Sequence, residues 1–319
     1  MRLGIDLGGT KIEIIALADD GRELFRKRVA TPQGDYPATV EQICRLVIDA
    51  EYFLQHDKAL AEDLFAARPP SVGIGIPGAL SLKTGLVKNA NSVCLIGQPL
   101  QADIENRLGR KIRISNDANC LTVSEATDGA AAGEKIVFGV IIGTGTGGGI
   151  SINQQLLTGA NAITGEWGHN PLPWRRADDG EVTKCYCGLN DCIETFLSGP
   201  GMLKRYNAMI AAGDKALQPR DILLRAEQGN QQAEAFITLY EDWLARALAS
   251  VINILDPHSI VLAGGLSNVQ RLYENVPQRW SEYVFSDHVS TRLVRALHGD
   301  SSGVRGAAWL WTEGVSNEQ

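Results

Sequence analysis

The sequence has no long hydrophobic run and no surplus of basic residues. Its 319 residues include 30 lysines and arginines against 37 aspartates and glutamates, a net charge of -7. A nucleic-acid groove needs clustered Lys and Arg to replace phosphate counterions, so this balance argues against a nucleic-acid partner. The first residues, MRLGIDLGG, run directly into a strand-like pattern, without an apolar segment that could serve as a signal peptide or a membrane span. We therefore expect a cytoplasmic protein that binds small molecules and no membrane.

Low-complexity segments are absent as well. The 34 glycines gather in a few loops, and 44% of the residues are hydrophobic, as expected for a folded protein. A chain of this length can form two globular units that share a cleft, because a single hydrophobic core rarely grows beyond about 250–300 residues.

Two segments follow the same plan of strand, glycine turn and strand. Residues 3–17 (LGIDLGGTKIEIIAL) and 137–153 (VFGVIIGTGTGGGISIN) each place an alternating strand after a Gly/Thr turn. This repetition predicts an internally duplicated chain, with one α/β unit built on each hairpin. The other predicted strands are 71–77, 111–119 and 258–268, and the predicted helices are 37–66, 118–131, most of 194–252 and 301–311.

Neither turn fits a known dinucleotide or P-loop motif. Gly143, Gly145 and Gly148 satisfy G-x-G-x-x-G, but a strand follows them where that fingerprint requires a helix. In the first turn Thr10 precedes Lys11, the reverse of the order in a P-loop. One such turn alone would be an ordinary hairpin, whereas two matched turns favour a nucleotide site.

The turns nevertheless carry groups that can bind phosphate. Glycines let backbone N–H groups approach a ligand closely, Thr10 and Thr144 offer hydroxyls, and Lys11 adds a positive charge. Asp6 lies at the end of the first strand, where its carboxylate could hold Mg²⁺ directly or through water, or cap the turn.

Three of the six cysteines lie close together in the sequence, at 185, 187 and 192. In a reducing compartment such a cluster indicates a metal site in preference to a disulfide framework. Cys185, Cys187 and Cys192 together with His169 supply the four soft ligands of a closed tetrahedral zinc site. Four protein ligands leave no position for substrate, so the expected zinc is structural. The alternative is three free thiols beside an unrelated histidine.

Five motifs carry a resemblance to the ROK family of repressors and sugar kinases: DLGGTK at 6–11, SNDAN at 115–119, GTGTGGG at 143–149, GEWGH at 165–169 and CYCGLNDCIE at 185–194. The resemblance implies the α/β actin-like ATPase fold of hexokinases, in which two ribonuclease-H-like lobes close on ATP and a sugar. The lobes are expected at 1–117, with a helix at about 300–313 packing back, and at 118–299. A homodimer is the family's usual assembly.

The resemblance also assigns roles to residues. A hexose hydroxyl needs a base to take its proton, and Asp117 matches the family's catalytic aspartate, although an N-cap is the alternative for that position. Sugar contacts are expected from Asn91, Asn116, Asp117, Glu166, His169 and Glu194. The zinc is expected to fix the loop that carries Glu166, His169 and Glu194. Nucleotide contacts, with Mg²⁺, are expected from Gly4, Asp6, Gly8, Gly9, Thr10, Lys11, Gly143, Thr144, Gly145, Thr146, Gly147, Gly148, Gly264 and Gly265.

Within the family the sequence is most similar to bacterial fructokinases with manno(fructo)kinase activity, through VKNANS at 87–92, GEWGHNPLPW at 165–174 and HGDSSGVRGAAWLW at 298–311. This similarity implies phosphorylation of D-fructose to D-fructose 6-phosphate, with mannose as a further substrate. An N-acetylhexosamine kinase is the alternative within the same chemistry. A sugar-sensing repressor is the alternative from another class. It is disfavoured because the first strand begins by Leu3 and leaves no room for a helix-turn-helix.

Overall fold

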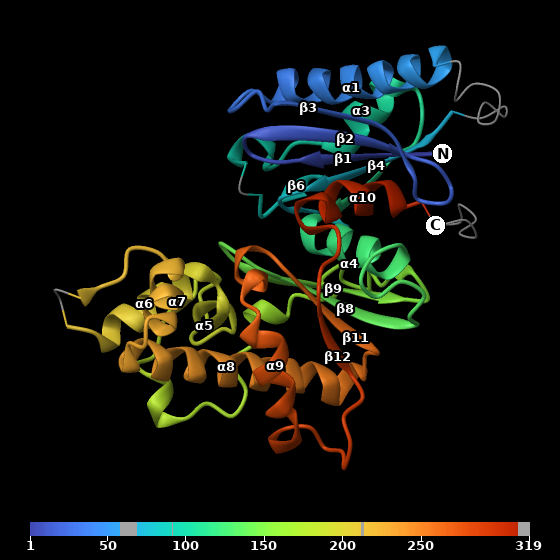
Figure 1. The fold of residues 1–319 in the computed structure, drawn as a ribbon. Coiled ribbons are helices and arrows are strands. Elements are labelled where there is room, and N and C mark those ends of the chain that lie inside the picture. The colour runs from blue at the N-terminus through green and yellow to red at the C-terminus, as the bar shows by residue number, and fades with distance from the viewer. Residues whose placement is uncertain (58–68, 91, 212–213, 312–319) are drawn as a thin grey trace. The chain divides into compact units, whose positions relative to one another are not determined.

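The computed structural model describes residues 1–57, 69–90, 92–211 and 214–311, which form two compact units (Figure 1). The first unit contains Met1–Ala132, Thr158–Ala162 and the described residues from Asp300 onward, and the second contains Gly133–Leu157 and Ile163–Gly299. The division after residue 117 expected from the sequence differs from this one, because the helix that starts there packs within the first unit. Among the described residues no helix has both the length and the apolar character needed to cross a bilayer.

The first unit is built on a five-stranded sheet with the order β3-β2-β1-β4-β7. Its strands are β1 (Arg2–Leu7), β2 (Lys11–Leu17), β3 (Glu23–Ala30), β4 (Ser71–Ile76) and β7 (Arg113–Asn116). The pairs β1-β2 and β2-β3 are antiparallel, and β1-β4 and β4-β7 are parallel. The expected hairpin at residues 3–17 is therefore confirmed.

Helices cover both faces of this sheet. They are α1 (Tyr36–His56), α3 (Leu100–Leu108), α4 (Asp117–Thr127) and α10 (Ser302–Trp309), and the short elements are β5 (Ala79–Leu80), β6 (Val87–Lys88), η1 (Val93–Leu95) and η7 (Gly299–Ser301). In β2, Ile12 and Ile14 pack in the core beneath α1, whereas Ile15 and Leu17 pack in the core beneath α10. The strand is consequently buried on both faces. Of the helix predicted at 37–66, residues 58–66 lie outside the described residues.

Three glycines allow α10 to lie directly on the sheet and on α4. A Cβ atom on Gly73 would lie 1.9 Å from the Ala307 carbonyl oxygen, and one on Gly306 would lie 1.7 Å from the carbonyl oxygen of Cys120. A Cβ on Gly4 would lie 2.1 Å from the carbonyl oxygen of the α10 backbone above it. Gly4 was expected to contact the nucleotide, but it is buried in this interface and serves the packing of α10.

The second unit repeats the same sheet. Its strands are β10 (Gln155–Leu156), β9 (Thr146–Ile152), β8 (Ile136–Ile142), β11 (Ser259–Ala263) and β12 (Arg292–Arg295), in that order across the sheet. Two antiparallel pairs, β8-β9 and β9-β10, are again followed by two parallel pairs, β8-β11 and β11-β12. The matching order and polarity confirm the internal duplication.

The helical segment predicted after the cysteine cluster is divided into four helices. These are α5 (Glu194–Leu197), α6 (Gly199–Met209), α7 (Pro219–Glu227) and α8 (Gln231–Leu255), followed later by α9 (Arg271–Gln278). The 3₁₀ turns of this unit are η2 (Trp167–His169), η3 (Ala177–Asp179), η5 (Gly265–Asn268) and η6 (Trp280–Glu282). An edge-to-face contact between Phe196 and Trp243 packs α5 against α8.

Gly73→Ala should lower the free energy of unfolding by about 3 kcal/mol, because the added methyl group must displace the α10 backbone. Urea denaturation measures this change. Gly9→Ala is the control, since a Cβ there would meet only the Ser92 hydroxyl, at 3.7 Å. Equal stability of the two variants would contradict the packing role of Gly73.

Candidate active site

The first unit brings two expected site carboxylates to one edge of its sheet. Asp6 lies near the end of β1, and Asp117 directly follows β7, which runs parallel to β1 on the far side of β4. The pKa of Asp6 rises to about 6 because the residue is largely buried and because the negative charges of Asp117 and Glu13 lie nearby. Arg28 and Lys11 oppose this rise. The two carboxylates are therefore close enough to repel one another.

Asp117 does not cap helix α4. The N-cap is Asn116, whose Oδ1 accepts the N–H of Asn119 at 2.8 Å, and Asp117 is the first helical residue. The side chain of Asp117 is exposed, yet the surrounding protein limits its hydration enough to raise the pKa of the carboxyl. The N–H of Ala118, which donates to Oδ1 at 2.8 Å, acts in the opposite direction. The helix thus leaves the second carboxylate oxygen of Asp117 available to a ligand.

The turn between β1 and β2 directs its carbonyl groups toward the protein. The Thr31 hydroxyl donates to the Gly8 carbonyl at 2.7 Å, and the backbone N–H of Thr31 donates to the Thr10 carbonyl at 3.0 Å. The amide of Gln33 donates to the Gly9 carbonyl at 3.3 Å. Gly9, Thr10 and Lys11 are exposed, so this turn offers a ligand mainly N–H groups, a hydroxyl and an ammonium group.

A cavity of about 1220 Å³ lies beside the second glycine turn. Gly143, Thr144 and Gly265 line it, so three of the expected nucleotide contacts share one cavity. Its remaining walls come from α6, α7, α8, the segment before α9 and α9 itself. They include the basic side chains of Arg220 and Arg271 and the acidic side chains of Glu227, Glu234 and Glu274. The pattern of the sequence did not indicate these helical walls, because they come from separate helices that meet only in the fold.

The loop that carries Glu166 and His169 lies directly on β9. A Cβ on Gly168 would lie 2.0 Å from the Thr146 carbonyl oxygen, and one on Gly165 would lie 2.4 Å from the Gly148 carbonyl oxygen. The indole of Trp167 donates to the Gly147 carbonyl at 3.1 Å. Gly148 is buried beneath this loop, so it serves packing and not the nucleotide contact expected for it.

Glu194 joins the second glycine turn to the start of α5. Its Oε2 accepts the N–H of Thr146 at 3.0 Å. A Cβ on Gly145 would lie 2.8 Å from the same oxygen, so the glycine makes room for the carboxylate.

Gly264 has φ +86, and a Cβ there would lie 2.4 Å from the Ile142 carbonyl oxygen. The absence of a side chain at Gly264 therefore lets its backbone pass close to that of Ile142. Of the remaining expected sugar contacts, Glu166 is exposed, and Asn91 lies outside the described residues.

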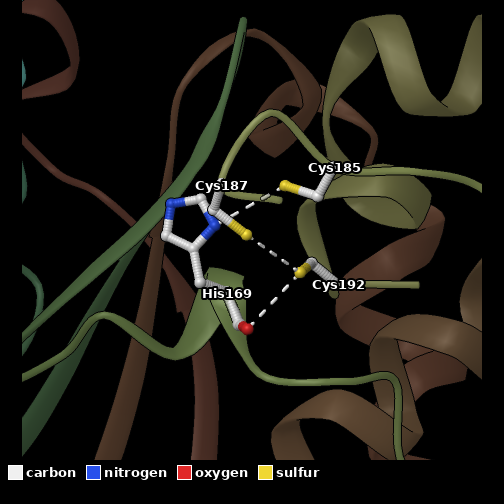
Figure 2. Close-up of side chains that lie close together, drawn as sticks. All are labelled: His169, Cys185, Cys187 and Cys192. Atoms are coloured by element: carbon white, nitrogen blue, oxygen red, sulfur yellow. Dashed lines mark hydrogen bonds between the residues drawn. The ribbon is translucent and has the colours of Figure 1, made fainter. Parts of the chain in front are cut away.

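His169, Cys185, Cys187 and Cys192 converge on one point in the second unit (Figure 2). One ligand atom from each lies within 4.8 Å of all the others. The Cys187 and Cys192 sulfurs are 3.6 Å apart, and His169 Nδ1 is 3.7 Å from the Cys185 sulfur. The cluster therefore has the donors and the spacing to hold a metal ion.

The two ring nitrogens of His169 face different groups. Nδ1 faces the cysteine cluster, and Nε2 lies 3.0 Å from the hydroxyl of Tyr186, which is an exposed residue. One histidine can therefore contact a metal ion and a second polar group at the same time. The roles predicted for His169 are those of a metal ligand and a sugar contact. Tyr186 was not predicted, since an aromatic residue between two cysteines carries no signal of its own.

Two duplicated ribonuclease-H-like sheets, each with a glycine turn after its first strand, define a protein of the actin-like ATPase class. The ROK family model matches residues 2–314, and the chain belongs to the ROK family. It is 37% identical to an N-acetyl-D-glucosamine kinase of Yersinia enterocolitica, over 97% of this chain and 99% of that one. It is 38% identical to an N-acetyl-D-glucosamine kinase of Salmonella paratyphi C, with the same shares covered.

Two solved structures extend the comparison. The ROK hexokinase from Thermus thermophilus has a TM-score of 0.82 and 27% identity, with 97% of each chain covered. A ROK family glucokinase from Streptomyces griseus, in complex with glucose and AMPPNP, has a TM-score of 0.69 and 27% identity, with 98% of this chain and 99% of that chain covered. The chain is a sugar kinase of the ROK family, as its motifs indicated. The fructose expected from the same motifs is not supported, and the N-acetylhexosamine alternative agrees better with the named relatives.

Asp6→Asn should make the protein more stable than the wild type at pH 7 and above. The folded protein raises the Asp6 pKa from its ordinary value of 3.8 to about 6, so protonated Asp6 favours the fold below pH 4 and this contribution is lost as pH rises through 6. The variant, which cannot ionise there, should gain up to about 1–3 kcal/mol over the wild type between pH 4 and 7. Urea titrations without added magnesium measure the difference. Asp20→Asn, at an exposed position of the same unit, should show no such trend, and a pH-independent difference for Asp6→Asn would contradict the expectation.

Proposed function

We propose that the chain transfers the γ-phosphoryl group of ATP to a hydroxyl group of N-acetyl-D-glucosamine. The observation that carries this substrate is the 37–38% identity, over 97% of the chain, to kinases named for that sugar. The sugar kinase reaction itself requires a base, a nucleotide site and groups that recognise a polyol, and the two units contain residues suited to each task.

Asp117 is the proposed general base. Its carboxylate would take the proton of the sugar hydroxyl as that oxygen forms its bond to the γ-phosphorus and ADP leaves. A carboxyl group with a raised pKa accepts a proton more readily than an ordinary aspartate, so the limited hydration of Asp117 favours this role. Asn116, adjacent to it, would orient the sugar with the side-chain nitrogen that its capping bond leaves available.

Asp6 is the proposed residue that holds Mg²⁺ beside the ATP phosphates. A magnesium ion supplies positive charge that offsets the charge developing on the transferred phosphoryl group. The fit is electrostatic, since Asp6 lies near the negative charges of Asp117 and Glu13, and a cation would relieve their repulsion. The N–H groups of Gly9 and Thr10 and the Lys11 ammonium group would contact the phosphates, whereas the Gly8 N–H already donates to the Lys11 carbonyl at 3.0 Å.

The cavity lined by Gly143, Thr144 and Gly265 is the proposed site of the nucleoside part of ATP. On the sugar, Glu166, His169 and Glu194 would accept and donate hydrogen bonds to hydroxyl groups, a combination suited to a polyol. Glu194 is the best positioned of these residues, because the N–H of Thr146 already fixes one of its oxygens.

Zinc is the proposed metal of the His169 cluster. Bonds of about 2.3 Å to sulfur and about 2.0 Å to nitrogen at tetrahedral angles place two sulfurs about 3.8 Å apart and a sulfur and a nitrogen about 3.6 Å apart. The observed separations, 3.6 Å between the Cys187 and Cys192 sulfurs and 3.7 Å from His169 Nδ1 to Cys185, agree with these values. Four protein ligands would make the zinc structural, and its task would be to hold the segments that carry His169 and Glu194.

Fructose is the second candidate substrate. Its support is the similarity of the stretches 87–92, 165–174 and 298–311 to bacterial fructokinases. Most of the last stretch forms α10, whose small residues serve packing on the sheet, so that stretch says little about the sugar. Mannose would follow fructose as a substrate under this reading.

A panel of N-acetyl-D-glucosamine, N-acetyl-D-mannosamine, fructose, mannose and glucose, assayed by ADP release, tests the substrate. N-acetyl-D-glucosamine should give the highest kcat/KM.

Asp117→Asn should lower kcat on that sugar by at least roughly a hundredfold with an unchanged fold, as expected when a general base is lost. A preference for fructose would overturn the proposed substrate alone, whereas an Asp117→Asn enzyme with wild-type kcat would remove Asp117 from the role of base.

Removal of the metal should lower the melting temperature by at least about 5 °C and raise the KM for the sugar, while the KM for ATP stays the same. Added Zn²⁺ should restore both properties, and added Mg²⁺ should not. Cys187→Ser should reproduce the metal-free behaviour, and Cys94→Ser, outside the cluster, should not. Unchanged melting and sugar affinity after chelation would contradict a structural zinc.

A further inference from the structure

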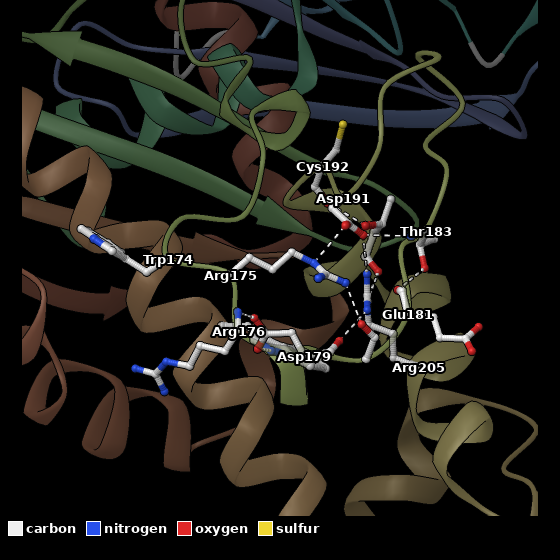
Figure 3. Close-up of polar contacts among 12 residues, drawn as sticks. Trp174, Arg175, Arg176, Asp179, Glu181, Thr183, Asp191, Cys192 and Arg205 are labelled. Carbon is white, nitrogen blue, oxygen red and sulfur yellow. Dashed lines mark hydrogen bonds and ion pairs between the residues drawn. The ribbon is translucent and has the colours of Figure 1, made fainter.

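The loop between His169 and Cys192 contains a network of buried charges that the proposed reaction does not use (Figure 3). Asp179 is fully buried, and its carboxylate forms hydrogen bonds of 2.5–3.0 Å with the guanidinium of Arg246 and of 2.7 Å with the indole of Trp243. Burial alone would raise the pKa of Asp179, but the hydrogen bonds from Arg246 hold it below its usual value. This ion pair fixes the middle of the loop to helix α8.

A second ion pair lies next to the metal cluster. Asp191, the residue before Cys192, has its Oδ2 2.9 Å from Arg175 Nε and its Oδ1 3.3 Å from Arg205 Nη2. Its Oδ1 also accepts the N–H of Thr183 at 2.9 Å. Asp191 and Arg205 are both more than nine-tenths buried, so the attraction between them is only weakly screened by solvent.

The backbone of Asp191 is in the left-handed region, with φ +52. That conformation is costly for a residue with a side chain, although Asp and Asn tolerate it better than most. Its N–H donates to the Thr183 carbonyl at 2.8 Å, and its carbonyl accepts the N–H of Leu172 at 2.9 Å. The contacts of Asp191 therefore stabilise a bend that directs Cys192 toward His169.

Arg205 contacts the chain on both sides of Cys192. Besides Asp191, its guanidinium donates from Nε to the Thr195 carbonyl at 3.0 Å and from Nη1 to the Asp179 carbonyl at 2.8 Å. The group also lies 3.3 Å from the ring centroid of Phe196. One buried cation on α6 thus holds residues 191 and 195, and the segment between them contains Cys192 and Glu194.

We propose that Asp191 and Arg205 form a positioning pair that orients Cys192 toward the metal and Glu194 toward the sugar. The inference rests on the proposed function for the identity of the metal and the sugar. It predicts that one ion pair, which contacts neither ligand, sets both the retention of zinc and the affinity for the sugar.

Asp191→Gly tests the pair, because glycine accepts φ +52 without strain and removes only the carboxylate. The variant should release zinc to a colorimetric chelator at least about tenfold faster than the wild type. Its KM for the sugar should rise severalfold, while its kcat and its KM for ATP stay within about twofold. Asp191→Asn keeps an oxygen acceptor and the same backbone tolerance, so it should lie between Asp191→Gly and the wild type.

Glu181→Gln is the matched control, since it removes one acidic charge from an exposed position of the same loop. If Asp191→Gly matches this control in zinc release and sugar KM, the pair is merely structural and the proposal is overturned, even if melting is lowered. A wild-type protein without zinc would overturn the proposed metal site and this inference with it. A wild-type protein that holds zinc but prefers another sugar would overturn only the substrate, and the KM measurements would then use that sugar.

Discussion

The proposed sugar site of the second unit depends on the direct contact between the backbone of the loop at 165–168 and strand β9. Without side chains at Gly165 and Gly168, the loop approaches β9 closely enough for Trp167 to bond to a strand carbonyl. This contact places His169 near the cysteine cluster, and Glu194 is tied to the same strand through Thr146. The glycines of β9 are therefore needed for packing as well as for ligand access. A larger residue in the loop or in the strand would displace His169 and Glu194 together.

In the first unit, the proposed site depends on two carboxylates, Asp6 and Asp117, that repel one another. Burial raises the pKa of Asp6, and the nearby charges of Asp117 and Glu13 raise it further. The positive charges of Arg28 and Lys11 lessen this rise, and the Asp6 carboxylate also lies beside Gly303 in the first turn of α10. Folding alone gains nothing from two close carboxylates, whereas a kinase that must bind a cation and accept a proton gains from both. The arrangement is a case in which local stability is lowered at the place where the chemistry is expected.

Sequence patterns could predict the two hairpins, the buried strand β11 and helix α10, because each combines a clear hydrophobic period with glycine or small-residue boundaries. They could not predict β3, whose charged residues are exposed at a sheet edge, or the walls of the large cavity, which come from separate helices. The roles of Gly4 and Gly148 differ from expectation for a related reason. A glycine that admits a ligand and a glycine that admits a neighbouring backbone look the same in a sequence, and only the fold shows what lies above each one.

Shared motifs identify the family but not the sugar, because motif residues can serve packing instead of substrate recognition. Most of the stretch 298–311 forms α10, which rests on β1, β4 and α4 through glycines at the contacts, so this stretch reports on packing more than on the sugar. Substrate choice depends instead on side chains that face the sugar and on how firmly they are held. In this chain buried charges hold the loop that connects His169 to Cys192, since Arg246 and Arg205 both bind Asp179 in the middle of the loop and Arg205 also binds Asp191 at its end. The proposed Asp191–Arg205 pair would therefore place part of the control of sugar affinity in residues that support the site and do not contact the sugar.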